Sequence, residues 1–283
     1  MIVVTGATGQ LGRLVIQSLL ASVPAADIVA AVRRPAQAAD LAALGVQLRQ
    51  ADYGQPATLD LAFAGASKLL LISSSELGQR VQQHQNVIDA AKRTGVGLVA
   101  YTSVLHADRS PLGLAAEHRA TEAALAASGL PHVLLRNGWY TENYLASVPA
   151  ALQHGAFIGC AGDGRIASAA RADYAAAAAA VLTQDGQAGR IFELAGDDSY
   201  SLGELAAELS RQAGKTVPYV NLPEAEFKGA LLGAGLPEPL ARLLADSDSG
   251  ASQGALFDDQ HQLSQLIGRP TTPWATMLKA ALA

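Results

Sequence analysis

The chain has 283 residues, of which 50% are hydrophobic and 16% charged, and its formal net charge is -5. Such a chain can bury a substantial core in one large α/β domain, alone or with a smaller lobe. The acidic balance, with no basic run longer than Arg33-Arg34, argues against nucleic acid as a partner. No segment has the roughly 20 apolar residues that a membrane span needs.

Cysteine and histidine usage excludes two further kinds of site. Cys160 is the single cysteine, so no intramolecular disulfide can form. The six histidines show no paired ligand spacing, so we expect no metal. Because the glycine turn begins at Gly6, so close to Met1, we expect no signal peptide and a cytoplasmic location. The oligomeric state stays open, a homodimer included.

The most informative segment is a glycine-rich turn near the start of the chain. Met1–Val4 predicts a buried strand, Leu11–Leu20 has the apolar spacing of a helix, and between them the glycines follow the pattern GxxGxxG. Strand, glycine turn and helix in this order are typical of a dinucleotide-binding turn, in which the helix N-terminus faces the pyrophosphate. Gly6 would turn the chain, Gly9 would admit the pyrophosphate, and Gly12 would let the helix pack closely. An ordinary tight turn is the alternative.

Apolar strand-like runs alternate with helical segments through the first half of the chain. The expected strands are 1–4, 28–32, 46–48, 68–72, 98–102 and 133–135. The expected helices between them are 11–21, 36–44, 58–63, 78–94 and 114–128. This alternation predicts an α/β fold with a Rossmann-type, doubly wound parallel sheet and helices on both faces. Ligands of such sheets bind at the carboxyl ends of the strands.

The character of the sequence changes after about residue 145. We expect a glycine-rich loop at 155–164, an alanine helix at 173–183, a strand at 190–195, and a helix through Gln212 that Ser201 caps. The remainder, 218–283, looks like a small lobe. We therefore predict a cofactor-binding Rossmann domain at 1–145, to which 165–200 return. A smaller substrate-side lobe is expected at 146–164 and 201–283.

The end of the second expected strand bears on the choice between NAD and NADP. A site for NAD usually has a carboxylate about 20 residues beyond the glycines, where this chain has Arg33 and Arg34. A guanidinium matches a 2′-phosphate, so Arg33 favours NADPH, with NADH as a weaker cofactor. The alternative is two solvated loop arginines, and we expect Arg34 to be solvated.

Three other strand ends fall at the expected ligand edge. Ser73, Ser74 and Ser75 could lie along the cofactor's ribose or form an N-cap cluster for the next helix. Asp52-Tyr53 could touch adenine, although Asp is common in turns. The polar and aromatic run Arg136–Asn143 would suit a nicotinamide and a flat partner. Within that run, Trp139 and Tyr140 could equally be core aromatics.

Four segments together resemble the NmrA-like atypical short-chain dehydrogenases/reductases, most closely their bacterial type 2 NADPH:quinone oxidoreductases. They are TGATGQLG at 5–12, the serines at 73–75, LRNGWYTEN at 135–143, and IASAARADY at 166–174. The resemblance runs over essentially the whole chain. It implies an NADPH-dependent quinone oxidoreductase. No residue pattern in the sequence implies a flavin or a metal.

The resemblance also implies a set of cofactor contacts. They are Gly6, Ala7, Thr8, Gly9, Gln10, Leu11, Gly12, Arg33, Ser73, Ser74, Ser75, Asn137, Gly138, Trp139, Tyr140, Thr141, Glu142, Ala169, Ala170, Arg171, Ala172 and Asp173. The contacts at 169–173 come from the resemblance alone. Judged as residues, Arg171 and Asp173 could equally form a helix cap and a surface ion pair.

One absence bears on the chemistry. Ordinary short-chain dehydrogenases use a Tyr with a Lys four residues later as acid, and none of the seven tyrosines here has that lysine. This disfavours ketone reduction and sugar epimerisation. A quinone needs less help, because its product is aromatic. Tyr101 and His118 are weak candidates for a catalytic hydrogen-bond donor, since an exposed pair of His118 with Glu122 is the commoner arrangement.

Two other functions stay open. The first is an NADP(H)-binding redox sensor of NmrA type, which binds the cofactor and regulates a partner without turnover. The second is a reductase of phenolic ether or isoflavone-type substrates, which would want a lysine within 114–128, where there is none.

Overall fold

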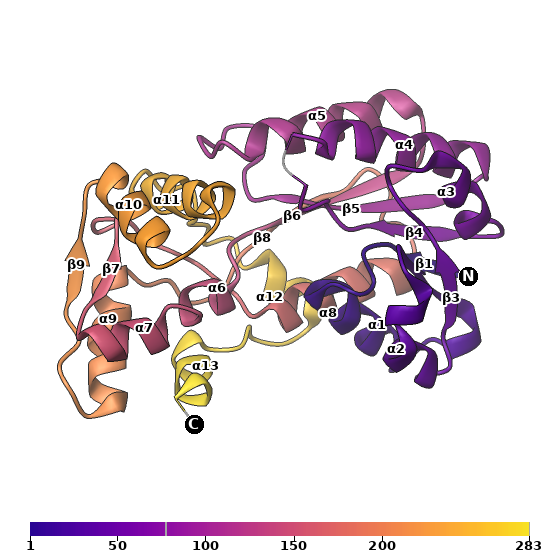
Figure 1. Cartoon of the computed structure of the whole chain (residues 1–283). Helices are drawn as coiled ribbons and strands as arrows, with labels where there is room; N and C mark the ends of the chain where they lie inside the picture. Colours follow the sequence, from indigo (N-terminus) through magenta and orange to yellow (C-terminus); the bar gives the residue numbers. More distant parts are fainter. Residues whose placement is uncertain (77, 283) are drawn as a thin grey trace. The chain divides into compact units, whose positions relative to one another are not determined.

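The computed structural model describes residues 1–76 and 78–282 (Figure 1). The chain forms two compact units. The first consists of Met1–Ala107, Ala116–Asn137 and Arg171–Phe192, and the second of Asp108–Ala115, Gly138–Ala170 and Glu193–Ala283. The domain ranges expected from the sequence stay a prediction, because compactness alone does not define parts that fold separately.

A seven-stranded sheet with the order β3-β2-β1-β4-β5-β6-β8 forms the framework of the fold. Its strands are β1 (Ile2–Val4), β2 (Ile28–Val32), β3 (Gln47–Gln50), β4 (Lys68–Leu71), β5 (Leu98–Val104), β6 (His132–Asn137) and β8 (Ile191–Leu194). The pairs from β3 to β6 are all parallel. From β1 the chain adds strands on one side, and from β4 on the other, so the strand order reverses between β1 and β4. The predicted doubly wound sheet is confirmed, and its ligand crevice lies at the carboxyl ends of these strands.

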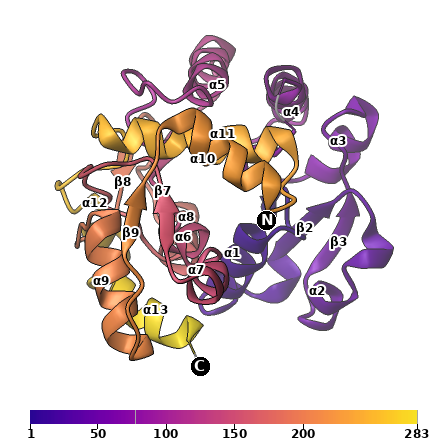
Figure 2. The same ribbon diagram turned by 60° about the vertical axis from the view of Figure 1, so that its left-hand side comes forward.

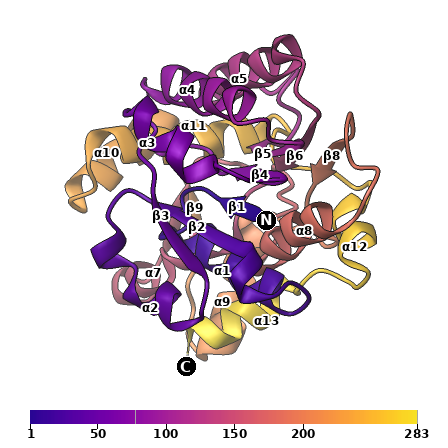
Figure 3. The same ribbon diagram turned by 90° about the vertical axis from the view of Figure 1, so that its right-hand side faces the viewer.

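Helices cover both faces of this sheet, as Figures 1 and 3 show. One face carries α1 (Gln10–Leu20), α2 (Ala39–Ala43) and α8 (Arg171–Thr183), and the other α3 (Pro56–Phe63), α4 (Arg80–Arg93) and α5 (Ala115–Ser128). Short 3-10 turns stand at Ala25–Asp27 and Pro35–Gln37. Strands β1, β2 and β5 are buried along their whole length, which explains the continuous apolar sequence of β1 and β2. The alanines of α8 are mostly buried, and this helix packs against α1.

The second unit contains the remaining elements. Its helices are α6 (Thr141–Leu145), α7 (Val148–His154), α9 (Leu202–Ala213), α10 (Glu224–Gly233), α11 (Glu238–Ser252), α12 (Gln262–Ile267) and α13 (Trp274–Ala281). Figure 2 shows β7 (Phe157–Gly159) beside β9 (Tyr219–Asn221), with α10 and α11 next to them. The sequence prediction of a loop over 155–164 is wrong at β7, since that strand exists through pairing with a distant segment. The Ser201 cap of α9 is confirmed as a capping box with Glu204.

A buried carboxylate joins three elements of the second unit. Asp248 on α11 is 4% exposed; it accepts hydrogen bonds from the Tyr144 hydroxyl of α6 at 2.9 Å and from the Cys160 N–H after β7 at 3.1 Å. Burial raises the pKa of Asp248 to about 6, against the opposing effect of these two hydrogen bonds. Burial, together with the charge of Asp248, raises the pKa of the Cys160 thiol to about 12, so the lone cysteine stays protonated.

We expect this carboxylate to make the stability of the protein depend on pH. The pKa of Asp248 is higher in the folded than in the unfolded chain, so its stabilising contribution is complete below the unfolded value of 3.8 and is lost as pH rises through about 6. Between pH 5 and pH 7.5, the free energy of unfolding of the wild type should fall by about 1 kcal/mol relative to that of Asp248→Asn. Urea unfolding of both proteins at several pH values measures this difference. A difference that stays constant with pH would contradict the assigned pKa.

Candidate active site

The glycine turn packs directly against the first turn of helix α1. Gly6 has φ +58°, in the left-handed region that favours glycine. A Cβ atom on Gly12 would lie 2.5 Å from the carbonyl oxygen of Gly6 and 2.7 Å from the Cα of Ala7. Gly9 is the N-cap of α1, and no side chain within the described chain caps this helix. The first N–H groups of α1 are therefore left for an anion, as a pyrophosphate site requires.

Thr5 and Tyr53 brace the strand ends beneath this turn. The Thr5 hydroxyl donates to the Leu70 carbonyl at 2.8 Å and accepts from the Ile72 N–H at 3.1 Å. The buried hydroxyl of Tyr53 lies 2.5 Å from Thr5 Oγ1. Asp52 accepts from the Gly54 N–H at 2.9 Å, which is a turn contact. These contacts give Asp52-Tyr53 a structural role, and contact with adenine stays a prediction.

Arg33 and Glu76 form an ion pair at the same edge. Arg33 follows β2 and Glu76 lies beyond β4, and Arg33 Nη1 is 2.7 Å from Glu76 Oε1. Since β1 lies between β2 and β4, the pair spans the carboxyl end of β1. Sequence reasoning missed Glu76, because 43 positions separate the partners and no local pattern joins them. Arg34 is exposed, as expected.

The serine segment after β4 is held by side chains of its neighbours. The Ser73 N–H donates to Thr102 Oγ1 and the Ser74 N–H to His84 Nε2, both at 2.9 Å. His84 is neutral, because burial lowers its pKa to about 3, and its Nδ1 is 2.9 Å from Thr121 Oγ1. Helix α4 has Gln79 at its N-cap, so the alternative reading of the serines as a cap cluster is wrong. Ser75 is exposed at the cofactor edge.

Tyr101 and His118, the candidate catalytic donors, are buried against each other. Tyr101 is 0% and His118 5% exposed, and the Tyr101 hydroxyl is 2.7 Å from His118 Nδ1. Burial raises the pKa of Tyr101 and lowers that of His118, so both are neutral. The expected exposed pair of His118 with Glu122 is wrong; Glu122 accepts from Arg136 Nη2 at 2.7 Å instead. A donor must reach its substrate, so this geometry supports a structural role, and a catalytic one stays a prediction.

Asn137 places a hydrogen-bond acceptor at the carboxyl ends of the strands, and this acceptor is uncommitted because it bonds to no described residue. It is the last residue of β6 and 6% exposed, and its Oδ1 has no hydrogen-bond partner among residues 1–76 and 78–282. A buried polar atom left in this state is costly, so a ligand donor is expected to satisfy it. The open helix start, the glycine cradle and this acceptor together fit a dinucleotide that carries an amide group.

In the second unit, the backbone brings together two segments of the predicted cofactor site. The Thr141 N–H donates to the Ala169 carbonyl at 3.0 Å, and the Ala169 N–H donates to the Trp139 carbonyl at 3.1 Å. The Thr141 and Ser168 hydroxyls are 2.8 Å apart. The segments 138–142 and 169–170 are therefore neighbours, although about thirty residues separate them. Gly138, Trp139, Tyr140 and Glu142 are half-buried, and Ala169 and Ala170 are buried.

The start of α8, in the first unit, lies beside the glycine turn. The Arg171 side chain donates a hydrogen bond to Gln10 Oε1, at the first residue of α1. Ala172 is exposed, whereas Asp173 is fully buried. The reading of Asp173 as part of a surface ion pair is therefore wrong. The position of Arg171 agrees with a cofactor contact, which sequence pattern alone did not reveal.

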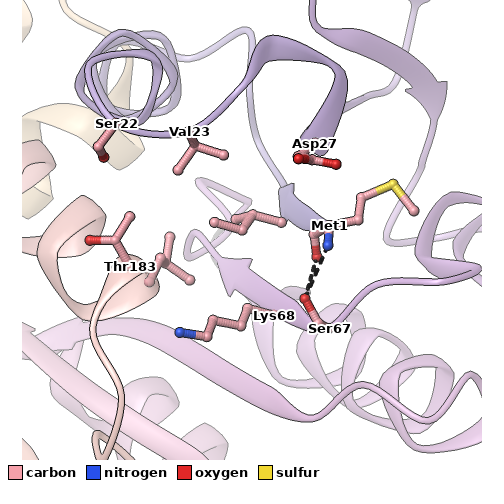
Figure 4. A pocket seen from close by; sticks show the side chains of 9 residues that line it. Met1, Ser22, Val23, Asp27, Ser67, Lys68 and Thr183 are labelled. Atoms are coloured by element: carbon pink, nitrogen blue, oxygen red, sulfur yellow. Dashed lines mark hydrogen bonds between the residues drawn. The ribbon is translucent and has the colours of Figure 1, made fainter.

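A cavity of about 490 Å³ opens at the opposite edge of the sheet (Figure 4). It is lined by Met1, Ile2, Ser22, Val23, Asp27, Ser67, Lys68, Leu182 and Thr183. These residues surround the amino ends of β1 and β4, where the Met1 ammonium donates to Ser67 Oγ at 3.1 Å. The cavity is therefore separate from the glycine turn. Within the described residues there is no cluster of three His, Cys, Asp or Glu side chains that could hold a metal.

Comparison with known proteins agrees with this geometry. The model of a family described as NAD(P)H-binding matches residues 6–185. Quinone oxidoreductase 2 of Escherichia coli is 64% identical over 275 residues, which are 97% of this chain and 96% of that protein. This chain belongs to the NAD(P)H-binding family.

Solved structures agree over the full length. A crystal structure of an NADPH-dependent quinone oxidoreductase from Escherichia coli in complex with NADPH superimposes with a TM-score of 0.98, at 62% identity, and covers 100% of both chains. The triphenylmethane reductase of Citrobacter sp. in complex with NADP(H) has a TM-score of 0.95 at 40% identity, over 99% of this chain and 100% of that one. Among residues 1–76 and 78–282 of the present chain, no helix is long and apolar enough to cross a membrane.

The burial of Tyr101 leads to a prediction that separates its two roles. Tyr101→Phe removes the hydrogen bond to His118, so we expect a loss of about 1 to 2 kcal/mol in the free energy of unfolding and a kcat within about threefold of wild type. Quinone reduction and urea unfolding, measured on the same preparation, test both parts. His118→Asn, which keeps an acceptor close to the Tyr101 hydroxyl, is the matched variant. A hundredfold fall in kcat without loss of stability would establish Tyr101 as a catalytic donor.

Proposed function

We propose that this chain is an NADPH-dependent quinone oxidoreductase, which transfers two electrons directly from the cofactor to a quinone. One observation carries the proposal: the whole chain superimposes, with a TM-score of 0.98, on a solved NADPH-dependent quinone oxidoreductase that contains NADPH. In the balanced reaction, NADPH, a proton and the quinone give NADP⁺ and the hydroquinone. No flavin or metal enters this balance.

The residues of the first unit would bind the adenosine half of the cofactor. The N–H groups at the start of α1 face the pyrophosphate, and the Gly12 contact holds that helix end in place. Arg33 provides the guanidinium for the 2′-phosphate. The exposed Ser75 and the fixed backbone of Ser73 and Ser74 follow the ribose, because His84 and Thr102 hold that segment.

The nicotinamide half supplies a hydride when the cofactor is bound. Asn137 Oδ1 would accept the carboxamide N–H, because it is the uncommitted acceptor at the end of β6. In the second unit, the neighbouring segments 138–142 and 169–170 would orient the ring, and Trp139 and Tyr140 offer flat surfaces for a quinone. Contacts of Arg171, Ala172 and Asp173 with the cofactor, a cytoplasmic location and a homodimer stay predictions.

The assay that tests the proposed function is steady-state oxidation of NADPH and of NADH by the purified protein, with a benzoquinone or a naphthoquinone as acceptor. We expect turnover with a preference for NADPH, and hydroquinone formed in equal amount to NADPH consumed. Tight binding of NADPH without turnover of several quinones would contradict the enzyme and favour the redox sensor.

We expect Arg33 to determine the cofactor preference. Arg33→Ala removes the partner of the 2′-phosphate, so kcat/KM for NADPH should fall about tenfold to a hundredfold, while the value for NADH changes less than about threefold. The assay uses both cofactors at a fixed quinone concentration. Arg34→Ala is the matched control, since Arg34 is the exposed arginine next in sequence and should change neither value. Equal losses for NADPH and NADH would refute a 2′-phosphate contact.

A further inference from the structure

Glu76 is a second charged residue at the position where the 2′-phosphate is expected. Its Oε1 is 2.7 Å from Arg33 Nη1, so the guanidinium that would hold the phosphate already has a carboxylate partner. Both side chains are accessible, with 62% of Arg33 and 39% of Glu76 exposed. A ligand can therefore reach the pair and exchange with it.

This carboxylate is held in place by the buried side chain of Gln83. Gln83 Nε2 donates to Glu76 Oε2 at 2.7 Å, and Gln83 Oε1 accepts from the Ser74 hydroxyl. The Ser74 hydroxyl in turn accepts from the Glu76 N–H at 3.1 Å. The ends of these contacts are fixed, because Gln83 is 7% exposed and lies on α4. These hydrogen bonds hold the Glu76 carboxylate in a defined position opposite Arg33. Two mobile surface side chains that pair by chance would have no such support.

We propose that Glu76 is an internal competitor for the 2′-phosphate of NADPH, and thereby a residue that sets the preference between NADPH and NADH. The 2′-phosphate needs the same guanidinium and carries the same sign of charge as Glu76. NADPH binding therefore competes with Glu76 for the Arg33 guanidinium. NADH has a neutral 2′-hydroxyl at this position and leaves the pair intact. Glu76 accordingly weakens NADPH binding and leaves NADH binding unchanged.

This inference rests on the proposed use of NADPH, and its test is a binding measurement that needs no quinone. Calorimetric titration compares wild type and Glu76→Gln with NADP⁺ and NAD⁺, and with adenosine 2′,5′-bisphosphate and 5′-ADP as probes of the adenosine half. Glu76→Gln keeps the shape and a hydrogen bond to Gln83. We expect the affinity for the two 2′-phosphorylated ligands to rise about threefold to tenfold. The affinity for NAD⁺ and 5′-ADP should change less than twofold.

Two further variants decide how Glu76 acts. In an Arg33→Ala background, Glu76→Gln should change NADP⁺ affinity less than twofold, because the shared guanidinium is gone. Asp60→Asn is the control for net charge, because Asp60 pairs with Arg93 at 2.8 Å with similar exposure. It should alter no affinity.

Several results would overturn the inference. Unchanged or weaker NADP⁺ binding by Glu76→Gln would show that the carboxylate does not compete. If Glu76→Gln raised the NADP⁺ affinity equally in the Arg33→Ala background, Glu76 would repel the 2′-phosphate without competing for Arg33. Failure of the wild type to bind NADP⁺ at all would refute the proposed cofactor itself, whereas binding without quinone turnover would refute the enzyme and leave the role of Glu76 testable.

Discussion

The site depends on one close contact, between the start of α1 and the glycine turn. A Cβ on Gly12 would meet the Gly6 carbonyl at 2.5 Å, so the helix can approach this far only without a side chain there. That approach directs the helix N-terminus at the crevice between β1 and β4. The contact is supported from behind, because α8 presents small buried alanines to α1 and its Arg171 bonds to Gln10. A bulkier α8 would move α1 and with it the anion site.

In the first unit, hydrogen bonds between uncharged groups hold most of the chain segments at the carboxyl ends of the strands. Polar side chains can be buried there because they satisfy one another. Burial keeps the His84 ring neutral by lowering its pKa to about 3. Because Nε2 accepts the Ser74 N–H, the ring proton lies on Nδ1, 2.9 Å from Thr121 Oγ1. Thr5, Thr102 and Tyr53 likewise use hydroxyl groups to hold strand ends. The pair of Arg33 and Glu76 differs, because both members are charged and accessible. The charged pair is therefore the part of this edge that can respond to a change of cofactor.

The sequence predicted what depends on consecutive residues and missed what depends on distant ones. The parallel strands, the glycine turn and the Ser201 cap each leave a local pattern, and each was placed within a few residues. Strand β7 left none, because β9, some sixty residues later, is its partner. The pairing of Glu76 with Arg33 and the burial of Asp173 were missed for the same reason. Uncommitted groups such as Asn137 Oδ1 become visible only when the surrounding partners are known.

The buried Tyr101 and His118 are consistent with the chemistry of the proposed reaction, which does not need them as acids. Reduction of a simple ketone leaves an alkoxide, whose conjugate acid is about as weak an acid as water, so an enzyme must place a donor beside it. Reduction of a quinone leaves a phenolate, whose conjugate acid has a pKa of about 10, as for tyrosine. Such an anion takes a proton from water without a dedicated acid. A chain that lacks the Tyr–Lys pair and buries its Tyr–His pair is therefore suited to a quinone and poorly suited to a ketone.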